Sequence, residues 1–255
     1  MQKLVFGLAV CTIWALTQGA ATAASGTALG VDPDAEAERQ AETHLLTVGA
    51  DIFIGDRVVT GSTGQVQIKF DDSTELVVGP SSSLVIEDYL LREDGSAGKL
   101  ALNALAGTFR FVTGGAPKDR YTIKTPTGTI GVRGTAFEFY VTKAWTYVLM
   151  QHGAVIGRNK KGDKTMLLEA VCEVGQISLD EAIVVGHADQ VSGNDRDRLR
   201  QLFMYAANQR PLLRDFQISG AERCLKRPAG GEVGDSLSDP GSGGPAPTTP
   251  TEPRK

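Results

Sequence analysis

The chain has 255 residues, of which 41% are hydrophobic and 22% are charged, and its formal net charge is −4. This balance is typical of a folded protein with a sizeable apolar core, and it argues against a generally basic nucleic-acid-binding surface. We therefore expect no nucleic-acid partner.

The first 23 residues have the organisation of a secretory signal peptide. Lys3 gives a positive start, Leu4–Leu16 is apolar, and Ala21–Ala23 has the small-x-small pattern of a cleavage site. Residues 1–23 are therefore predicted to be removed, and the mature protein is expected to be periplasmic or secreted. An uncleaved membrane anchor is the alternative, although the apolar stretch is short for a bilayer span. No later segment is apolar for long enough, so we expect no membrane span after cleavage.

The next segment, residues 24–43, is acidic and rich in alanine. It has no clear apolar stripe and no clear alternation of apolar and polar residues. We therefore predict a linker or a loosely docked lead-in to the domain that follows.

Residues 44–178 read as a series of short strands separated by turn residues. Residues 65–70 alternate between polar and apolar side chains, which is typical of a strand with one buried face. A change in the parity of the apolar positions predicts a bulge or tight turn near Asn103 and Ala104. About ten strands without helices predict a mainly β domain, either a β-sandwich or a rolled antiparallel sheet.

The sharpest local signal in this domain is a second change of parity. Large apolar residues fall on even numbers and then on odd numbers: Ile130, Val132, Phe137 and Phe139. Because successive side chains of a strand point to opposite faces, this change indicates a β-bulge at Arg133 and Gly134. The predicted structural motif comprises Gly131, Val132, Arg133, Gly134, Thr135 and Phe137.

Arg133 has two interpretations. In the first, the bulge presents its guanidinium to a carboxylate on a ligand or a partner. In the second, which we favour, an internal salt bridge to Asp71, Asp72 or Glu138 fixes the bend, because an arginine within an apolar strand is more often satisfied internally. Thr135 is expected to point inward after the bulge, where its hydroxyl needs a hydrogen-bond partner.

Residues 179–227 are predicted to form a helical C-terminal extension. Ser178–Glu181 has the pattern of a capping box, which predicts a short helix over Ala182–Val185. A strand is the competing prediction, because three of those four residues are β-branched. A longer helix is predicted from Asn194 to Gln209, with apolar residues at helical spacing on one face that is expected to pack on the β domain.

Two cysteines remain after removal of the signal peptide, Cys172 and Cys224. An even number of cysteines in an exported protein suggests one disulfide bond, and two separate buried thiols are the alternative. Closing a loop of about fifty residues contributes ~4 kcal/mol in the chain-entropy model. The bond would tie the helical extension to the last strand of the β domain.

The last segment, residues 228–255, contains six prolines, six glycines and no aromatic residue. Such a segment cannot bury enough apolar surface to offset the entropy lost on ordering. We therefore predict a disordered tail.

The sequence contains no pattern typical of catalysis or metal binding. The motifs of zinc proteases, redox dithiols and nucleophile-elbow hydrolases do not occur, and the three histidines lack partners at metal-site spacing. Asp71 and Asp72 fit a turn better than an acid–base pair, because adjacent strand residues point to opposite sides. We predict no enzyme, no catalytic residues, no metal site and no cofactor.

Five segments occur in a recognisable order along the chain. They are Gly55–Gly61, Phe70–Leu76, Gly107–Phe111, Thr125–Phe137 and Leu149–Val155. Together they resemble the FecR-type periplasmic domain, named for the ferric-citrate signalling regulators, over roughly residues 45–178. The resemblance implies an all-β periplasmic module used in sensing or protein contact, and it implies no reaction.

The resemblance and the export signal favour a non-catalytic binding module in envelope signalling or assembly, whose partner is another envelope protein or an unidentified ligand. The ferric-citrate regulators carry a cytoplasmic segment and a membrane helix before this domain, and here the predicted signal peptide stands in their place. Any signalling role is therefore expected to need a second protein. The competing hypotheses are a structural or adhesive surface protein and a polysaccharide-active enzyme, which would need two carboxylates facing one cleft.

Overall fold

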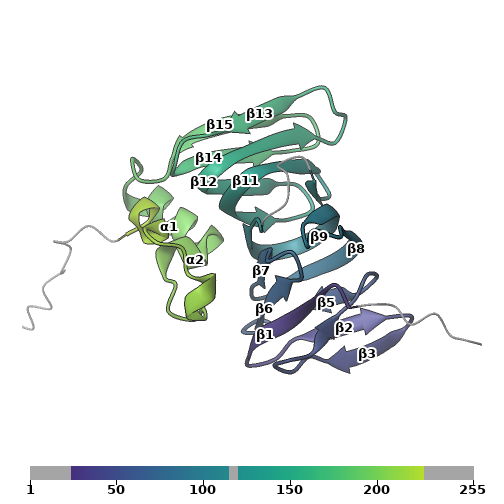
Figure 1. The fold of residues 1–255 in the computed structure, drawn as a ribbon. Helices are drawn as coiled ribbons and strands as arrows, with labels where there is room; N and C mark the ends of the chain where they lie inside the picture. Colours follow the sequence, from purple (N-terminus) through teal and green to yellow (C-terminus); the bar gives the residue numbers. More distant parts are fainter. Residues whose placement is uncertain (1–23, 115–119, 227–255) are drawn as a thin grey trace, which may run out of the picture.

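The computed structural model describes residues 24–114 and 120–226. The predicted signal peptide and the predicted disordered tail lie outside these residues. The described chain forms fifteen strands that join into one sheet, followed by two α-helices and two 3-10 helices (Figure 1). The prediction of a mainly β fold with a small C-terminal helical appendix is confirmed.

The elements follow one another with short connections. The strands are β1 (Gly26–Asp32), β2 (Glu36–Arg39), β3 (Glu42–Leu45), β4 (Asp51–Ile52), β5 (Arg57–Val59), β6 (Gln65–Phe70), β7 (Glu75–Val78), β8 (Ser83–Leu91), β9 (Ala97–Val112), β10 (Tyr121–Lys124), β11 (Gly128–Val141), β12 (Thr146–Asn159), β13 (Thr165–Leu168), β14 (Glu173–Ile177) and β15 (Ala182–His187). The helices are α1 (Gly193–Leu202), α2 (Met204–Ala207), η1 (Arg214–Phe216) and η2 (Ala221–Cys224). Within the described ranges every strand pairing is antiparallel except that of β9 with β10.

Three long strands, β9, β11 and β12, give the sheet its rolled shape. The first half of β9 pairs with β8 and β10, and its second half pairs with β7 and β11. Similarly, β11 leaves β10 after Val132 and joins β9 at Ala136. One end of β12 pairs with β14 and the other with β13. The halves of the long strands therefore belong to two layers: one includes β8, β10 and β13, and the other includes β7 and β14. Each long strand passes from one layer into the other, as strands do at the corners of packed sheets.

The bends in these strands coincide with bulges. In β9 the register against β8 shifts at Leu105, one residue beyond the bulge predicted near Asn103 and Ala104. Gly107 follows with a φ of 110°, a conformation that favours glycine. An inserted residue increases the local twist and bend of a strand. The bulge therefore lies where β9 changes its pairing partners.

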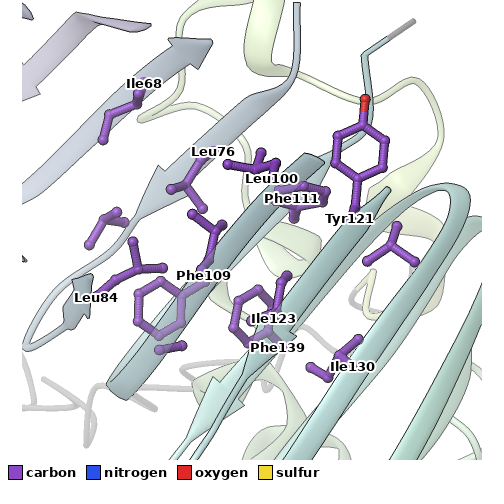
Figure 2. Close-up of a cluster of buried hydrophobic side chains, with 14 of the residues drawn as sticks. Ile68, Leu76, Leu84, Leu100, Phe109, Phe111, Tyr121, Ile123, Ile130 and Phe139 are labelled. Atoms are coloured by element: carbon purple, nitrogen blue, oxygen red, sulfur yellow. The ribbon is translucent and has the colours of Figure 1, made fainter. Parts of the chain in front are cut away.

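The main core lies between the two layers and is rich in aromatic rings. Phe109 and Phe139, which are cross-strand neighbours in β9 and β11, stack with ring centroids 4.9 Å apart. Phe111 and Tyr121 meet edge-on at 5.8 Å. Figure 2 shows these rings among the aliphatic side chains of Ile68, Leu76, Leu84, Leu100, Ile123 and Ile130. The alternating apolar residues that predict the strands are the residues that fill this core.

The prediction of a linker at residues 24–43 is wrong. Gly26–Asp32 forms β1, which pairs with β6, and Glu36–Arg39 forms β2, which pairs with β3 and β5. Buried positions of β1 are occupied by small residues, which an apolar pattern does not detect. The small size is required at Gly26, because a Cβ there would lie 2.6 Å from the carbonyl oxygen of Lys69.

The sheet also extends beyond residue 178, where its end was predicted. Ala182–His187 forms the edge strand β15, so the predicted short helix is wrong and the competing strand prediction is correct. The Ser178 hydroxyl accepts hydrogen bonds from the N–H groups of Asp180 and Glu181 in the turn before this strand. A serine side chain makes such bonds in turns as well as at helix starts, which explains the error.

The predicted helix from Asn194 to Gln209 is divided in two at Phe203. The backbone of Phe203 is not helical, with φ −117° and ψ 65°, and its side chain is fully buried. The division therefore places Phe203 in a second apolar cluster together with Leu149 and Ala206. Of the helices in residues 24–114 and 120–226, none combines the length and apolarity of a bilayer-spanning segment.

Candidate binding cleft

The helical appendix comprises residues 193–224, from the start of α1 to the end of η2. It lies against the outer face of the sheet, which we define as the face opposite the main core (Figure 1). Two apolar clusters hold it there. One contains Leu149 of β12 and Phe203. The other contains Val77 of β7 with Tyr205 and Phe216. Because these side chains are buried between the appendix and the sheet, the appendix is an integral part of the fold.

A disulfide bond between Cys172 and Cys224 ties the appendix to the sheet. Cys172 lies directly before β14 and Cys224 ends η2, and their Cα atoms are 5.1 Å apart. The bond joins residues 52 positions apart and closes a loop that contains β14, β15 and both α-helices. The predicted pairing of these two cysteines is present in the structure.

A buried ion pair lies between the sheet and the appendix. Arg110 of β9 and Glu138 of β11 are cross-strand neighbours, and neither is more than 1% exposed. Nε and Nη2 of Arg110 donate to Oε1 of Glu138 at 3.1 and 2.7 Å, and Nη1 donates to Oε1 of Gln209 at 2.5 Å. Gln209 also bonds to both main-chain groups of Ile218. The network therefore links two strands of the sheet to two parts of the appendix.

The Arg110–Glu138 pair is not among the predictions from the sequence, although the sequence contains a signal of it. Arg110 and Glu138 each lie between two phenylalanines in their strands. Opposite charges at such positions are compatible with a cross-strand pair on the face away from the core. The strand pattern alone predicts a solvated face there. Burial arises only because the appendix covers that face.

The carboxyl group of Glu138 has an unusual environment. Burial raises its pKa, and the Arg110 guanidinium opposes that shift. The amide of Gln151 and the N–H of Ala206 lie near enough to favour the charged form, but neither completes a hydrogen bond of normal geometry to Oε2. Among the described residues, Oε2 of Glu138 and both polar atoms of Gln151 are buried without a hydrogen-bond partner. Buried polar atoms are seldom left unpaired, so Gln151 is a candidate functional residue.

A cleft with a volume of about 450 Å³ opens beside Gln151. It lies where β11 and β12 meet the part of the appendix that follows η1. Its lining includes Gly134, Thr135, Gln151, His152, Ile218 and Arg223. The cleft thus combines the strand irregularity predicted from the sequence with residues of the appendix that the sequence does not associate with it.

The bulge in β11 forms one wall of this cleft. The register of β11 against β12 shifts after Arg133, at the predicted position, and Gly134 has a φ of 64°. The N–H of Thr135 donates to the hydroxyl of Thr113 at 3.0 Å, and the N–H of Thr113 donates to the carbonyl of Thr135 at 3.0 Å. The buried Thr135 hydroxyl donates to the carbonyl oxygen of His152. Hydrogen bonds therefore fix the bulge on both sides.

The residues of the predicted motif divide between the core and the cleft. Val132 and Phe137 are buried in the main core. Gly134 and Thr135 line the cleft, and Gly131 is half-buried on the strand before the bulge. The motif therefore positions two core side chains and one wall of the cleft at the same bend.

The internal salt bridge predicted for Arg133 is wrong. Arg133 is exposed, and no residue in the described part of the chain forms an ion pair with it. Glu138 pairs with Arg110 instead. Because the preceding residue, Val132, points into the core, the Arg133 side chain lies on the outer face, as the cleft does.

The other candidates from the sequence do not assemble into a site. Asp71 and Asp72 lie in the turn after β6, where the Asp72 carboxylate accepts hydrogen bonds from the N–H and hydroxyl of Thr74. This is the arrangement that the turn interpretation requires. In residues 24–114 and 120–226, no three or more His, Cys, Asp or Glu side chains are grouped as metal ligands.

Replacing Gly134 by valine is expected to lower the free energy of unfolding by about 1–3 kcal/mol, because a β-branched residue is strained at positive φ. Urea unfolding of the purified protein measures the change. Gly131→Val on the same strand is the matched control, since a Cβ there meets only one atom, 3.7 Å away. We expect the control to be nearly neutral. Equal losses in the two variants would contradict a bulge that depends on Gly134.

Comparison with known proteins gives one family match. The family model described as FecR protein matches residues 56–156, which include the bulge in β11. The resemblance identified in the sequence is therefore confirmed over this segment. Comparison with curated proteins gives no match.

Comparison with solved structures gives distant matches. Two crystal structures of a candidate anti-sigma factor from Parabacteroides distasonis, at 1.65 and 2.50 Å resolution, align with TM-scores of 0.42 and 0.40 and identities of 12% and 13%. Each alignment covers 51% of this chain and 59% of that chain. The chain thus spans less than two thirds of the length of these structures, and the likeness is too low to assign a function.

Proposed function

We propose that this chain, which matches the FecR family over residues 56–156, is an exported, non-catalytic binding module that acts in envelope signalling. Its partner is another envelope protein or a ligand, and no reaction is required of it. The observation that carries the proposal is the cleft at the β11 bulge. Gln151, His152 and Arg223 line this cleft with hydrogen-bonding and basic groups, and the first two lie within the family segment.

The disulfide between Cys172 and Cys224 supports a location outside the cytoplasm. Disulfides persist in oxidising compartments such as the periplasm and are rare in the cytosol. Cell fractionation followed by thiol labelling of the denatured protein tests the location. We expect the protein in the periplasmic or secreted fraction with both cysteines protected. A cytoplasmic protein with two reactive thiols would contradict export.

Affinity capture from envelope extract, with the mature protein as bait, tests the binding function. The bait is used beside Ser219→Trp, which fills the cleft from an exposed lining position, and beside Ser62→Trp, an exposed control in a loop outside the cleft lining. We expect the wild type and the control to retain the same envelope component and Ser219→Trp to lose it. Retention of nothing by any bait would contradict a binding module. Equal retention by all three would exclude the cleft as the contact.

A further inference from the structure

The amide of Gln151 is the first indication of what the cleft binds. Gln151 is one of the lining residues and is only 4% exposed. Its amide lies near the Glu138 carboxyl group, but among the described residues neither of its polar atoms has a hydrogen-bond partner of normal geometry. A primary amide offers one acceptor oxygen and donor N–H groups at the same point. The matching ligand group is another amide, such as a main-chain peptide unit. A ligand of this kind would satisfy a polar group that the fold itself leaves unpaired.

The charge of the lining is the second indication. Arg223 and His152 are basic residues of the lining, and among the described residues no aspartate or glutamate lines the cleft. The carboxylate of the neighbouring Glu222 is engaged by the N–H of Gln209. Arg223 is exposed, and no described residue forms an ion pair with it. A guanidinium with free donors is suited to bind a carboxylate through two parallel hydrogen bonds.

The apolar part of the lining is the third indication. Val112, Ala136 and Ile218 contribute aliphatic or methyl groups next to the polar residues. The volume of about 450 Å³ falls within the range of about 300–1,000 Å³ that holds small ligands. The cleft can therefore accommodate a few residues of a chain with one aliphatic side chain, but not a folded surface.

We infer that this cleft captures the C-terminal end of a polypeptide, with Gln151 binding a main-chain amide, Arg223 binding the terminal carboxylate and the apolar lining receiving the last side chain. Amide, carboxylate and aliphatic groups occur side by side at a chain end. An internal peptide segment lacks the carboxylate, and a simple anion lacks the amide. The inference rests on the proposed binding function and specifies the chemistry of the ligand.

Isothermal titration of the mature protein with a synthetic peptide tests the inference. The probe is N-acetyl-Gly-Ala-Val with a free carboxylate, and the comparison is the same peptide with a C-terminal carboxamide. We expect the acid to bind at least about tenfold more tightly than the carboxamide, because only the acid engages the arginine fork. Acetate alone is expected to bind much more weakly than the peptide acid.

Two variants separate the roles of the two side chains. Arg223→Gln is expected to reduce affinity for the acid at least about tenfold and to abolish the preference over the carboxamide. Gln151→Met, which keeps the size of the side chain but removes the amide, is expected to weaken both peptides. Because the Gln151 amide also favours the charged form of Glu138, we expect a small fall in the melting temperature as well, while circular dichroism at the temperature of the titration should match that of the wild type. Arg214→Gln, at an exposed arginine of η1, is the control and should bind as the wild type does.

Several results would overturn this inference. Equal binding of the acid and the carboxamide, no binding of either at millimolar peptide, or binding of acetate as tightly as the peptide would each exclude recognition of a chain end. If the Ser219→Trp bait nevertheless loses an envelope component that the wild type retains, the proposed function stands and only the ligand assignment fails. Absence of any captured component together with tight peptide binding would instead contradict the envelope partner.

Discussion

Replacing Arg110 by leucine is expected to lower the free energy of unfolding by about 3–5 kcal/mol, because the substitution leaves a buried carboxylate without its counter-charge. Two of the three Arg110 nitrogens bond to Glu138 and the third bonds to Gln209 of the appendix. A typical domain has a stability of about 5–15 kcal/mol, so the loss is a large part of the total. Equilibrium unfolding in urea, followed by tryptophan fluorescence, measures it.

A double-mutant cycle provides the control for this prediction. Arg110→Leu combined with Glu138→Leu removes both charges, and we expect it to be much less destabilised than the sum of the single substitutions. Arg110→Lys keeps the charge but lacks the planar fork, so its loss should be intermediate. If the double variant loses as much free energy of unfolding as the two single variants together, the two side chains do not interact and the buried network has been misassigned.

The same variant has a pH dependence of defined sign. Burial already raises the pKa of Glu138, and removal of the Arg110 charge is expected to raise it further. A carboxyl group with a raised folded-state pKa holds more protons in the folded protein than in the unfolded chain. Its effect on stability therefore becomes more favourable as the pH falls from that pKa towards the unfolded value of 4.5. We therefore expect the loss of free energy of unfolding in Arg110→Leu, relative to the wild type, to be smaller at about pH 5 than at about pH 8. A deficit independent of pH would show that Glu138 does not change its protonation in this range.

Removing the disulfide is expected to lower the free energy of unfolding by about 4 kcal/mol, because the bond closes a loop across 52 positions. Cys172→Ala combined with Cys224→Ala tests this without leaving a free thiol. Unfolding in urea measures the loss, and limited proteolysis is expected to cut the appendix of the variant faster than that of the wild type. We expect the loss of the bond to affect the appendix most, because its last helix ends at one of the two cysteines.

A reducing agent gives an independent comparison. Reduction of the wild type should reproduce the loss seen in the alanine variant, and the variant itself should be insensitive to the agent. If thiol labelling shows the bond to be broken while the unfolding midpoint of the wild type stays constant, the stabilising role of the bond is excluded.

The sequence predicts the strand elements that depend on large apolar residues. The bulge in β11 is detectable because isoleucine, valine and phenylalanine on its two sides change parity. In contrast, β1 is not detectable, because its buried positions must be small where the strand passes close to the backbone of β6. Likewise β15 is preceded by a serine whose side-chain hydrogen bonds suit either a turn or a helix start.

The cleft could not be predicted from the sequence, because its walls come from distant parts of the chain. Thr113 follows the end of β9, Gly134 lies in β11, and Gln151 lies in β12, whereas Ile218 and Arg223 belong to the appendix. No local pattern predicts that the appendix turns back over the outer face. The cysteine count indicated that the appendix is tied to the sheet, but the cysteines do not specify which strands it covers.

The position of Cys224 determines how late in biosynthesis the cleft is completed. The segment Ile218–Arg223, which supplies one side of the cleft, immediately precedes this cysteine and is among the last parts of the described chain to be synthesised. During synthesis the cleft therefore lacks this wall until the end of the appendix has left the ribosome and packed on the sheet, and formation of the disulfide then fixes the residue next to that wall.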